Sequence, residues 1–181
     1  MSRSTDRLLE RLRSFDGDAL AEVYDQYAPA LYRYAYRLTG HRETAEDIVS
    51  EVFNRFLNAL KRDGGPETQV SAWLYRVAHN LVVDFYRRQP VQDPIDIEDV
   101  ILAGREDSHT DVERQELAER ARMALQQLTP LQQQIIVLRF LEEMSNEEVA
   151  AVVQKTVGAV KALQHRALGS LRRVLEEKHE V

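Results

Sequence analysis

The sequence predicts an all-α protein with two small helical domains, the second of which contains a helix-turn-helix. Three observations support this fold class. Apolar residues recur at spacings of three and four along much of the chain, which is the period of a buried helical face. No segment alternates convincingly between polar and apolar residues, as a half-buried strand would. Helix-start signals follow one another in the C-terminal third, and 181 residues suffice for two small cores.

The first two predicted helices lie in the N-terminal half. One covers residues 24–38 and closes at Gly40, and Pro29 is expected to kink it or to start a new turn. The other covers residues 45–60 and ends at the turn signal Asp63-Gly64-Gly65-Pro66. The residues expected to be buried are Tyr24, Tyr27, Ala28, Leu31, Ala35 and Leu38 in the first helix, and Ala45, Ile48, Val49, Val52, Phe53, Phe56, Leu57 and Leu60 in the second.

A third predicted helix covers residues 74–85 and has two distinct faces. It ends with Arg87 and Arg88 before Pro90, where cations suit a helix C-terminus. The buried stripe consists of Leu74, Val77, Ala78, Leu81, Val82 and Phe85, and the second face of Trp73, Arg76, Asn80, Asp84 and Arg87.

The C-terminal third predicts a helix-turn-helix. Thr129-Pro130 is an N-cap followed by proline at the first helical position, and it opens a helix at about 131–142. Ser145 and Glu148 form a capping box that opens a short helix. After a tight connection, Thr156 caps a last, long helix that runs to about residue 176.

The net charge of −6 argues against a nucleic-acid partner only until it is divided along the chain. Residues 1–89 are neutral, residues 114–181 carry +1, and residues 90–113 carry −7. The middle segment lacks a sustained helical period, which favours a solvated spacer. We therefore expect a helical domain at 1–89, an acidic linker at 90–113 and a second domain at 114–181. The acidic residues of the linker are Asp93, Asp96, Glu98, Asp99, Glu106, Asp107, Asp111 and Glu113.

The last predicted helix carries a local excess of positive charge. Between residues 155 and 175 there is no acidic residue, and this is the pattern expected of an element that faces phosphates. A helical hairpin with a solvated basic face is the alternative. The basic residues are Lys155, Lys161, Arg166, Arg172 and Arg173. The buried stripe is expected at Val160, Leu163, Ala167, Leu171 and Val174, and another side at Gly158, Lys161, Ala162, His165 and Gly169.

Several classes of function are disfavoured. The absence of cysteine excludes disulfides, thiolate metal sites, a cysteine nucleophile and a thiol sensor within the chain. No apolar run is long enough to span a membrane or to act as a secretory signal, so we expect a cytoplasmic protein. Gly64-Gly65 lacks the following Lys-Ser/Thr of a phosphate loop. The five histidines match no metal spacing, and Asp107-Ser108-His109-Thr110-Asp111 fits a flexible linker better than a cation site. We expect neither an enzyme nor a bound cofactor.

Three stretches resemble one family, the bacterial RNA polymerase sigma factors of the extracytoplasmic-function (ECF) type in the sigma-70 superfamily. Residues 20–53 resemble the start of its promoter-melting domain and its polymerase-docking helix. Residues 73–88 resemble its −10-reading helix and are the most specific of the three. Residues 128–130 and 148–161 resemble its −35-binding helix-turn-helix.

The resemblance implies partners and site residues. The partners would be core RNA polymerase, through its β′ coiled coil and β flap, promoter DNA, and as a further candidate an anti-sigma factor. The polymerase contact would include Asp47, Ile48 and Glu51. The −10 site would include Asp63 and Gly64 in a loop that takes a flipped base, together with Arg76, Asn80, Arg87 and Arg88. The −35 site would include Lys155, Thr156, Gly158, Lys161, His165 and Arg166. Trp73 and Tyr75 are candidates for base stacking or for the core.

The sequence departs from the family pattern at two places. Gln154 stands where the family usually has glycine in the turn. Ala162-Leu163 replace a common Ser-Arg in the recognition helix, so fewer polar groups point at base edges. We infer that −35 recognition relies on phosphates and DNA shape, or on His165 and Lys161.

Two other functions remain as alternatives. A free-standing helix-turn-helix regulator would explain the C-terminal half but not the stretch 73–88. An adaptor that mimics a sigma factor would carry an additional receiver domain, for which the chain has no room.

The resemblance also gives the acidic linker a role. In the family, the segment between the domains threads the polymerase cleft, and a charge of −7 there suggests that it mimics nucleic acid.

Overall fold

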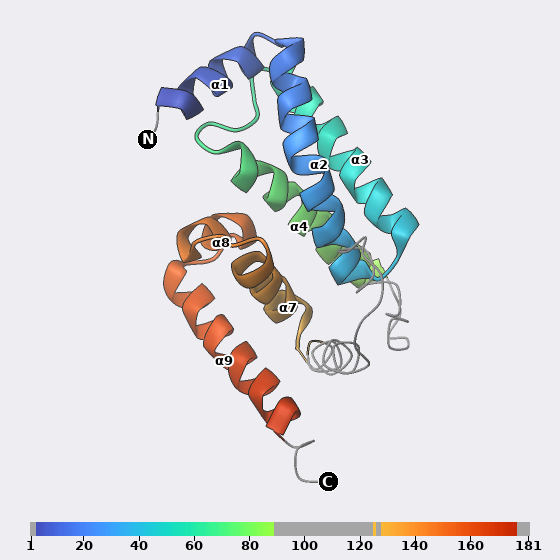
Figure 1. Cartoon of the computed structure of the whole chain (residues 1–181), viewed down its shortest axis with the longest axis vertical. Helices are drawn as coiled ribbons and strands as arrows, with labels where there is room; N and C mark the ends of the chain where they lie inside the picture. The colour runs from blue at the N-terminus through green and yellow to red at the C-terminus, as the bar shows by residue number, and fades with distance from the viewer. Residues whose placement is uncertain (1–2, 89–124, 126–127, 177–181) are drawn as a thin grey trace, which may run out of the picture. The chain divides into compact units, whose positions relative to one another are not determined.

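The computed structural model describes residues 3–88, 125 and 128–176. The predicted linker and the segment around His109 lie outside the described residues, and so does the side chain of Val174. The described residues form helices and connecting turns with no strand, which confirms the all-α fold class (Figure 1). The chain divides into two compact units, Met1–Phe85 and Tyr86–Val181, and each is described by itself.

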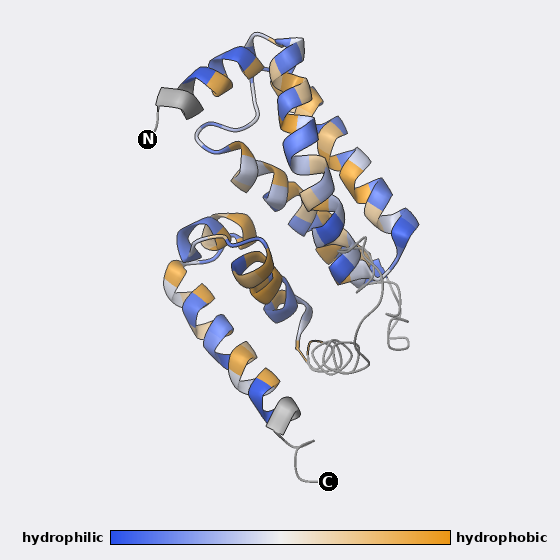
Figure 2. Ribbon diagram, viewed as in Figure 1, coloured by the Kyte–Doolittle hydropathy of each residue, from blue (hydrophilic) through white to orange (hydrophobic). Residues whose placement is uncertain are grey.

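The first unit contains α1 (Arg3–Arg13), α2 (Gly17–Thr39), α3 (Arg42–Leu60) and the greater part of α4 (Val70–Arg88). Polar and apolar residues occupy different sides of these helices, as amphipathic helices require (Figure 2). α2 and α3 pack along each other and are joined at Gly40, whose left-handed backbone (φ 71°) closes α2. The largest fully buried side chains include Leu12, Val23, Leu31, Tyr34, Leu38, Val52, Phe56, Leu74 and Val82.

Two stripe residues predicted to be buried are exposed. Tyr24 is 52% exposed, because Val23 takes the inward position and places Tyr24 about 100° further around the helix. The Tyr24 ring still packs on Phe53, with centroids 4.8 Å apart. Leu57 is 37% exposed, since Phe56 and Leu60 face the core on either side of it. α2 continues through Pro29, and no new helix begins there.

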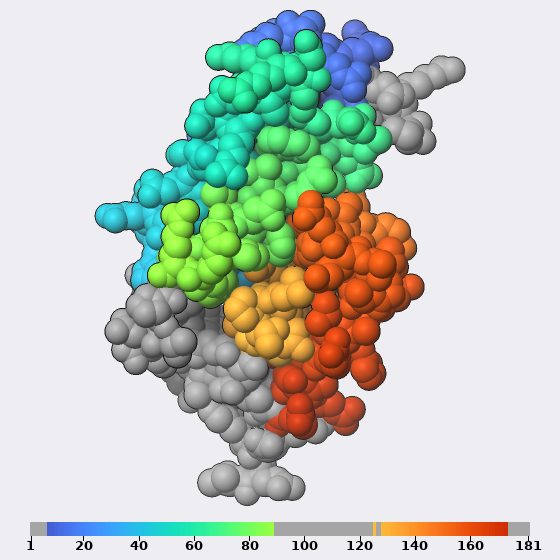
Figure 3. All heavy atoms as spheres, turned by 180° about the vertical axis from the view of Figure 1, so that it is seen from behind, coloured from blue at the N-terminus to red at the C-terminus, as the bar shows by residue number. Residues whose placement is uncertain are grey.

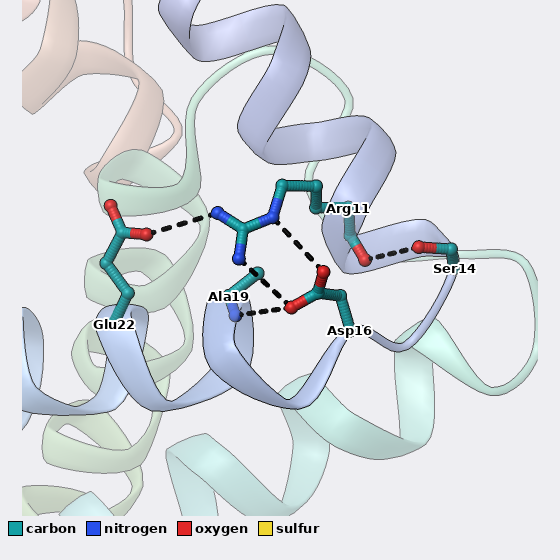
Figure 4. Close-up of polar contacts among 5 residues, drawn as sticks. All are labelled: Arg11, Ser14, Asp16, Ala19 and Glu22. Carbon is teal, nitrogen blue, oxygen red and sulfur yellow. Dashed lines mark hydrogen bonds and ion pairs between the residues drawn. The ribbon is translucent and has the colours of Figure 1, made fainter.

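Helix α1 was not predicted, although Leu9 and Leu12 carry its signal. Both side chains are buried, which holds α1 against the rest of the unit. The turn that follows is held by Asp16, whose Oδ1 accepts a hydrogen bond from the N–H of Ala19 at 2.9 Å and caps α2 (Figure 4). Arg11 donates to both carboxylate oxygens of Asp16, at 3.0 and 3.2 Å, and also reaches Glu22. The two helices are thus joined by a bidentate ion pair as well as by a cap.

Asp16 gives this turn a pH dependence. The hydrogen bond from Arg11, followed by that from the Ala19 N–H, lowers the pKa of Asp16. The stabilisation is therefore complete above the unfolded-state pKa of about 4 and is lost as the pH falls through the lower folded-state value. We expect Asp16→Asn, which retains a capping oxygen but no charge, to be less stable than wild type at pH 7. Urea unfolding should show this difference shrinking by pH 3; a difference that grows on acidification would contradict the assignment.

The second unit contains α7 (Pro130–Ile136), the π-helical η1 (Val137–Leu141), α8 (Asn146–Val153) and α9 (Val157–Glu176). The predicted start signals are confirmed. Thr129 and Ser145 each form a complete capping box, with Gln132 and Glu148 respectively. The Thr156 hydroxyl accepts the N–H of Ala159 at 3.2 Å. Buried residues of this unit include Leu128, Ile135, Ile136, Leu138, Val149, Val152, Val153, Val160 and Ala167.

The helix predicted at 131–142 is not a single α-helix. It becomes a π-helix at Val137, and the bond from the Glu142 N–H to the Val137 carbonyl, at 3.0 Å, spans five residues. The Arg139 guanidinium donates to the carbonyl of Met144 and so ties the end of this segment to the turn that follows. The apolar spacing of this segment does not distinguish a π-helix from an α-helix, so the sequence did not predict the change.

Gln154 closes α8 in the left-handed conformation, with φ 54°. Since that conformation costs a residue with a Cβ about 1–2 kcal/mol, and glycine loses about 0.5–1 kcal/mol in chain entropy, we expect Gln154→Gly to stabilise the protein by roughly 0.5–1 kcal/mol. Gln154→Val, with its branched side chain, should destabilise it. Urea unfolding of the two variants measures both effects, and a Gly variant no more stable than wild type would show that the turn carries no strain.

Candidate nucleic-acid interface

One side of α4 presents a row of residues suited to a DNA strand. Arg76, Asn80, Val83 and Arg87 follow spacings of four, three and four, so they lie along one helical face. Asn80, Val83 and Arg87 are exposed, Arg76 is half-buried, and Arg88 adds an exposed cation in the last turn. We name this row the α4 face; side chains of α4 form part of the molecular surface in Figure 3. It combines cations with an amide that can pair with a base edge.

The opposite side of α4 is fixed by the core. Leu74, Ala78 and Val82 are buried there. Tyr75 is only 3% exposed and meets the Tyr34 ring edge-on at 5.4 Å, so it is a core residue and offers no surface for base stacking. Trp73 is half-buried with its ring 5.6 Å from that of Phe56, which also favours packing. These contacts fix the rotation of α4 about its own axis, so the α4 face has a defined direction.

The loop after α3 is exposed and is closed by backbone hydrogen bonds. The N–H of Asp63 bonds to the carbonyl of Leu60 at 3.2 Å, and the N–H of Gly64 to the carbonyl of Ala59 at 2.9 Å. These two bonds form a Schellman motif with Asp63 in its left-handed position, at φ 53°. A Cβ on Gly64 would lie 3.2 Å from the Ala59 carbonyl oxygen, which makes glycine favourable there. Asp63 and Gly64 are both exposed, so the loop presents a fixed shape to a ligand.

The helix-turn-helix brings its predicted residues to one surface. Lys155, Thr156, Gly158, Lys161, His165 and Arg166 are all exposed, whereas Val160 and Ala167 are buried on the other side of α9. No atom lies within 4 Å of a Cβ built on Gly158, so packing does not require glycine there. The small size of Gly158 leaves room for another molecule to approach the start of α9 closely. Ala162 and Leu163 replace the Ser-Arg that is common in the family. Ala162 is exposed and Leu163 is half-buried, so only the replacement at Ala162 removes a polar group from the exposed surface.

The exposed side of α3 carries polar and charged residues. Asp47 is exposed and Glu51 half-buried, but Ile48 is 5% exposed and belongs to the core. Ile48 therefore shapes this surface from within and does not present a side chain to a partner. A hydrogen bond from Arg55, at 2.7 Å, and then one from Asn54 lower the pKa of Glu51. A shallow hollow on this side is lined by Glu51, Asn54, Arg55, Asn58, Ala59 and Arg62.

Comparison with known proteins identifies the family. The sigma-70 region 2 family matches residues 23–90, and the sigma-70 region 4 family matches residues 124–173. SigW, an ECF RNA polymerase sigma factor of Bacillus subtilis (strain 168), is 30% identical over 98% of this chain and 100% of its own length. The chain belongs to the ECF sigma factors.

A second relative agrees with this assignment, and a solved structure has a similar fold. BldN, an ECF RNA polymerase sigma factor of Streptomyces coelicolor, is 37% identical over 94% of this chain, which spans 65% of the length of BldN. A solved structure of CnrH in complex with the cytosolic domain of CnrY is 25% identical with a TM-score of 0.72. That comparison covers 96% of this sigma factor and 97% of CnrH.

The family matches divide the candidate sites of this sigma factor. The α4 face, the loop at Asp63 and the polar side of α3 lie within region 2, and the exposed residues of α9 lie within region 4. Helix α1 and the turn that follows it precede the region 2 match.

Among the described residues, no three His, Asp or Glu side chains gather as metal ligands. No helix in the described ranges is long and apolar enough to cross a membrane.

Sequence reasoning missed exposed apolar residues in both units. Val83, 42% exposed, lies between Asn80 and Arg87 on the α4 face. Phe140 and Leu141, each 48% exposed, lie side by side in the sequence at the end of η1. The signal for Val83 was its spacing from Asn80. The exposure of Phe140 follows from the π-helix, which shifts the helical phase and could not be read from the sequence.

Proposed function

We propose that this sigma factor binds core RNA polymerase through the polar side of α3 and directs promoter-specific initiation. In this proposal the α4 face and the Asp63 loop act at the −10 element, and α9 acts at the −35 element. The observation that carries it is the order of two sigma-70 regions along one chain, with a row of cations and an amide on α4, the last helix of the region 2 match.

The α4 face suits an unpaired strand. Arg76, Arg87 and Arg88 supply positive charge along the helix, which tracks a phosphate backbone. Asn80 reads the edge of a base that pairing no longer occupies, and Val83 supplies apolar contact. The Asp63 loop takes the flipped base, since its fixed shape and the Asp63 carboxylate can discriminate among base edges.

The helix-turn-helix suits duplex DNA. The exposed residues at the start of α9 enter the major groove, where recognition helices place their N-terminal turns. Lys161 and Arg166 hold phosphates, and His165 is the residue left to contact base edges where Ala162 offers none. This division favours a −35 contact of modest base specificity and strong dependence on salt.

The remaining partners follow the same chemistry. Asp47 and Glu51 present acidic groups to the β′ coiled coil. The exposed pair Phe140 and Leu141 offers an apolar contact to the β flap. The sigma factor RpoE of Bartonella quintana, which has a similar fold, was solved in complex with the anti-sigma factor NepR, and by analogy an anti-sigma factor is a candidate partner of this chain. The protein acts in the cytoplasm, catalyses no reaction itself and uses no cofactor.

The acidic linker gives this proposal a separate prediction. Residues 90–113 carry −7, which suits a mimic of nucleic acid in a basic channel of the polymerase. We expect replacement of Asp96, Glu98 and Asp99 by serine to weaken polymerase binding and to change the yield of abortive RNA. Polymerase binding and abortive RNA are both measured with purified proteins. If neither changed, the acidic residues of the linker would have no role in initiation.

Run-off transcription tests the proposed function. The full chain is mixed with core RNA polymerase of Streptomyces coelicolor, the source of BldN, and with a library of promoter fragments. We expect transcripts that start at a small set of related sequences and that require the chain. A free-standing helix-turn-helix regulator, the alternative, would give no transcript with core enzyme alone.

A further inference from the structure

The turn between α1 and α2 holds an aromatic residue in a conformation that aromatic residues avoid. Phe15 has φ 59°, in the left-handed region. Its N–H bonds to the carbonyl of Leu12 at 3.0 Å, and the N–H of Asp16 bonds to the carbonyl of Arg11 at 3.0 Å. These bonds define a Schellman motif with Phe15 at the position where glycine is preferred. A bulky residue with this backbone is an outlier that its surroundings must impose.

The surroundings of Phe15 do impose it. The Arg11–Asp16 ion pair and the Asp16 cap on Ala19 fix the residues on both sides of the turn (Figure 4). The Ser14 hydroxyl donates to the carbonyl of Arg11 at 2.8 Å. The ring itself gains little from folding, because Phe15 remains 40% exposed. Neither the backbone nor the core therefore explains a phenylalanine at this position.

Phe15 lies beside the loop that follows α3. The Lys61 ammonium is 5.8 Å from the centroid of the Phe15 ring, within the range of a cation–π contact. Lys61 is exposed and comes two residues before Asp63. In Figure 1 the ends of α1 and α3 lie at the same end of the first unit. An exposed aromatic ring and an exposed cation thus flank the loop at Asp63.

We propose that Phe15 and Lys61 form a binding site for one unpaired nucleotide of the promoter strand, next to the base held by the Asp63 loop. The base stacks on the exposed part of the Phe15 ring, and Lys61 holds an adjacent phosphate. An aromatic platform beside a cation is the general means of holding single-stranded DNA. A paired base cannot stack in this way, so the site acts only once the duplex opens. The inference rests on the proposed function, and Phe15 lies outside the region 2 match.

A docking site for polymerase is the competing explanation for an exposed ring. Exposed cations that could meet a phosphate backbone are present at Arg13, Lys61 and Arg62, but exposed carboxylates at Glu10, Asp18 and Asp63 balance them, so net charge does not separate the two explanations. The extent of the apolar surface does, because a protein contact would be expected to extend over neighbouring apolar residues. Ser14 and Gly17, beside Phe15 in the turn, offer none.

The test uses Phe15→Gly, which removes the ring and relieves the backbone. We expect its thermal midpoint to be no lower than that of wild type, because glycine accepts a positive φ at no steric cost. Holoenzyme with this variant should nevertheless give open complexes about ten-fold shorter-lived on a promoter found by run-off transcription, the effect of losing one base–aromatic stack. Phe15→Leu should behave alike, Phe15→Trp should retain full lifetime, and Lys61→Gln should be intermediate.

Three results would overturn this inference. One is an open-complex lifetime in Phe15→Gly and Phe15→Leu equal to that of wild type. Another is weaker binding of Phe15→Gly to core polymerase without DNA, measured by fluorescence anisotropy, which would assign the ring to a protein contact. The third is an equal loss of affinity for fully duplex and premelted −10 probes. Failure of the proposed function is distinct from these, because wild-type chain would then give no run-off transcript.

Cross-linking shows directly which nucleotide lies beside Phe15. Single 5-iododeoxyuridine substitutions across the non-template strand of the −10 region are irradiated in the open complex. We expect one position to cross-link to the peptide that contains Phe15, and a different position to cross-link near Asp63. No cross-link to the Phe15 peptide from any position would contradict the site.

Discussion

Replacing Asn80 by alanine is expected to reduce open-complex formation at a cognate promoter about ten-fold while leaving the fold intact. Asn80 is exposed at the middle of the α4 face, and its amide is the one uncharged side chain there that can pair with a base edge. Loss of one such contact costs about 1–3 kcal/mol. The stability of the variant should stay within about 0.5 kcal/mol of wild type, because the side chain is at the surface.

The control for Asn80 is a residue of the same kind elsewhere in the first unit. Gln26 is an exposed amide on a different helix, α2, so we expect Gln26→Ala to leave open-complex formation unchanged. Permanganate reactivity of unpaired thymines measures opening directly. If Asn80→Ala opened the promoter as well as Gln26→Ala, the α4 face would not read the −10 strand.

The second large effect is expected at the start of α9. Lys161→Ala combined with Arg166→Ala removes two exposed cations from the surface predicted to face the −35 duplex. Each phosphate contact contributes nearly one unit to the slope of log affinity against log salt, so we expect the slope for holoenzyme to fall by about two. The loss should be similar for different −35 sequences, since phosphates carry no sequence information.

The control for these cations lies on the same helix. Arg173 is exposed in the last turn of α9, and its guanidinium donates to the Ser170 hydroxyl at 3.3 Å. Because the groove is expected to receive the N-terminal turns of α9, Arg173→Ala should leave the salt slope almost unchanged. Filter binding of holoenzyme to duplex promoter over a range of KCl concentrations measures both. Equal slopes for the double variant and wild type would show that α9 does not contact the DNA phosphates through these residues.

The sequence predicted the fold where local chemistry decides it. Gly40, Thr129, Ser145 and Thr156 begin or end helices through bonds to residues at most four positions away, and each acts as predicted. Stripes of apolar residues located the helices themselves. The family resemblance was confirmed as well, because it depended on motifs spread over both units.

Features that depend on tertiary packing were not predictable in the same way. Tyr24 and Leu57 show this, since both are exposed although both have helical spacing from core residues. The π-helix at Val137 was also missed, because apolar spacing does not distinguish it from an α-helix. The left-handed Phe15 follows from the ion pair at Asp16, and an aromatic residue gives no sequence signal for such a turn.

Helix ends connect the fold to the proposed function. Phe15 and Asp63 occupy left-handed positions at the ends of α1 and α3, and Gln154 does so at the end of α8, two residues before the cap of α9. Each of these turns adjoins a surface assigned to DNA. Strained backbone commonly lies at functional sites, because the fold can hold a side chain there in a fixed direction.

Equilibrium binding of the full chain to its two partners distinguishes a sigma factor from a free-standing regulator. Fluorescently labelled chain is titrated with core RNA polymerase alone, with duplex promoter DNA alone, and with both. We expect tight binding to core polymerase without DNA, weak binding to duplex DNA without polymerase, and sequence-specific DNA binding when both are present. Tight, specific binding to duplex DNA alone, with no affinity for core polymerase, would contradict this expectation.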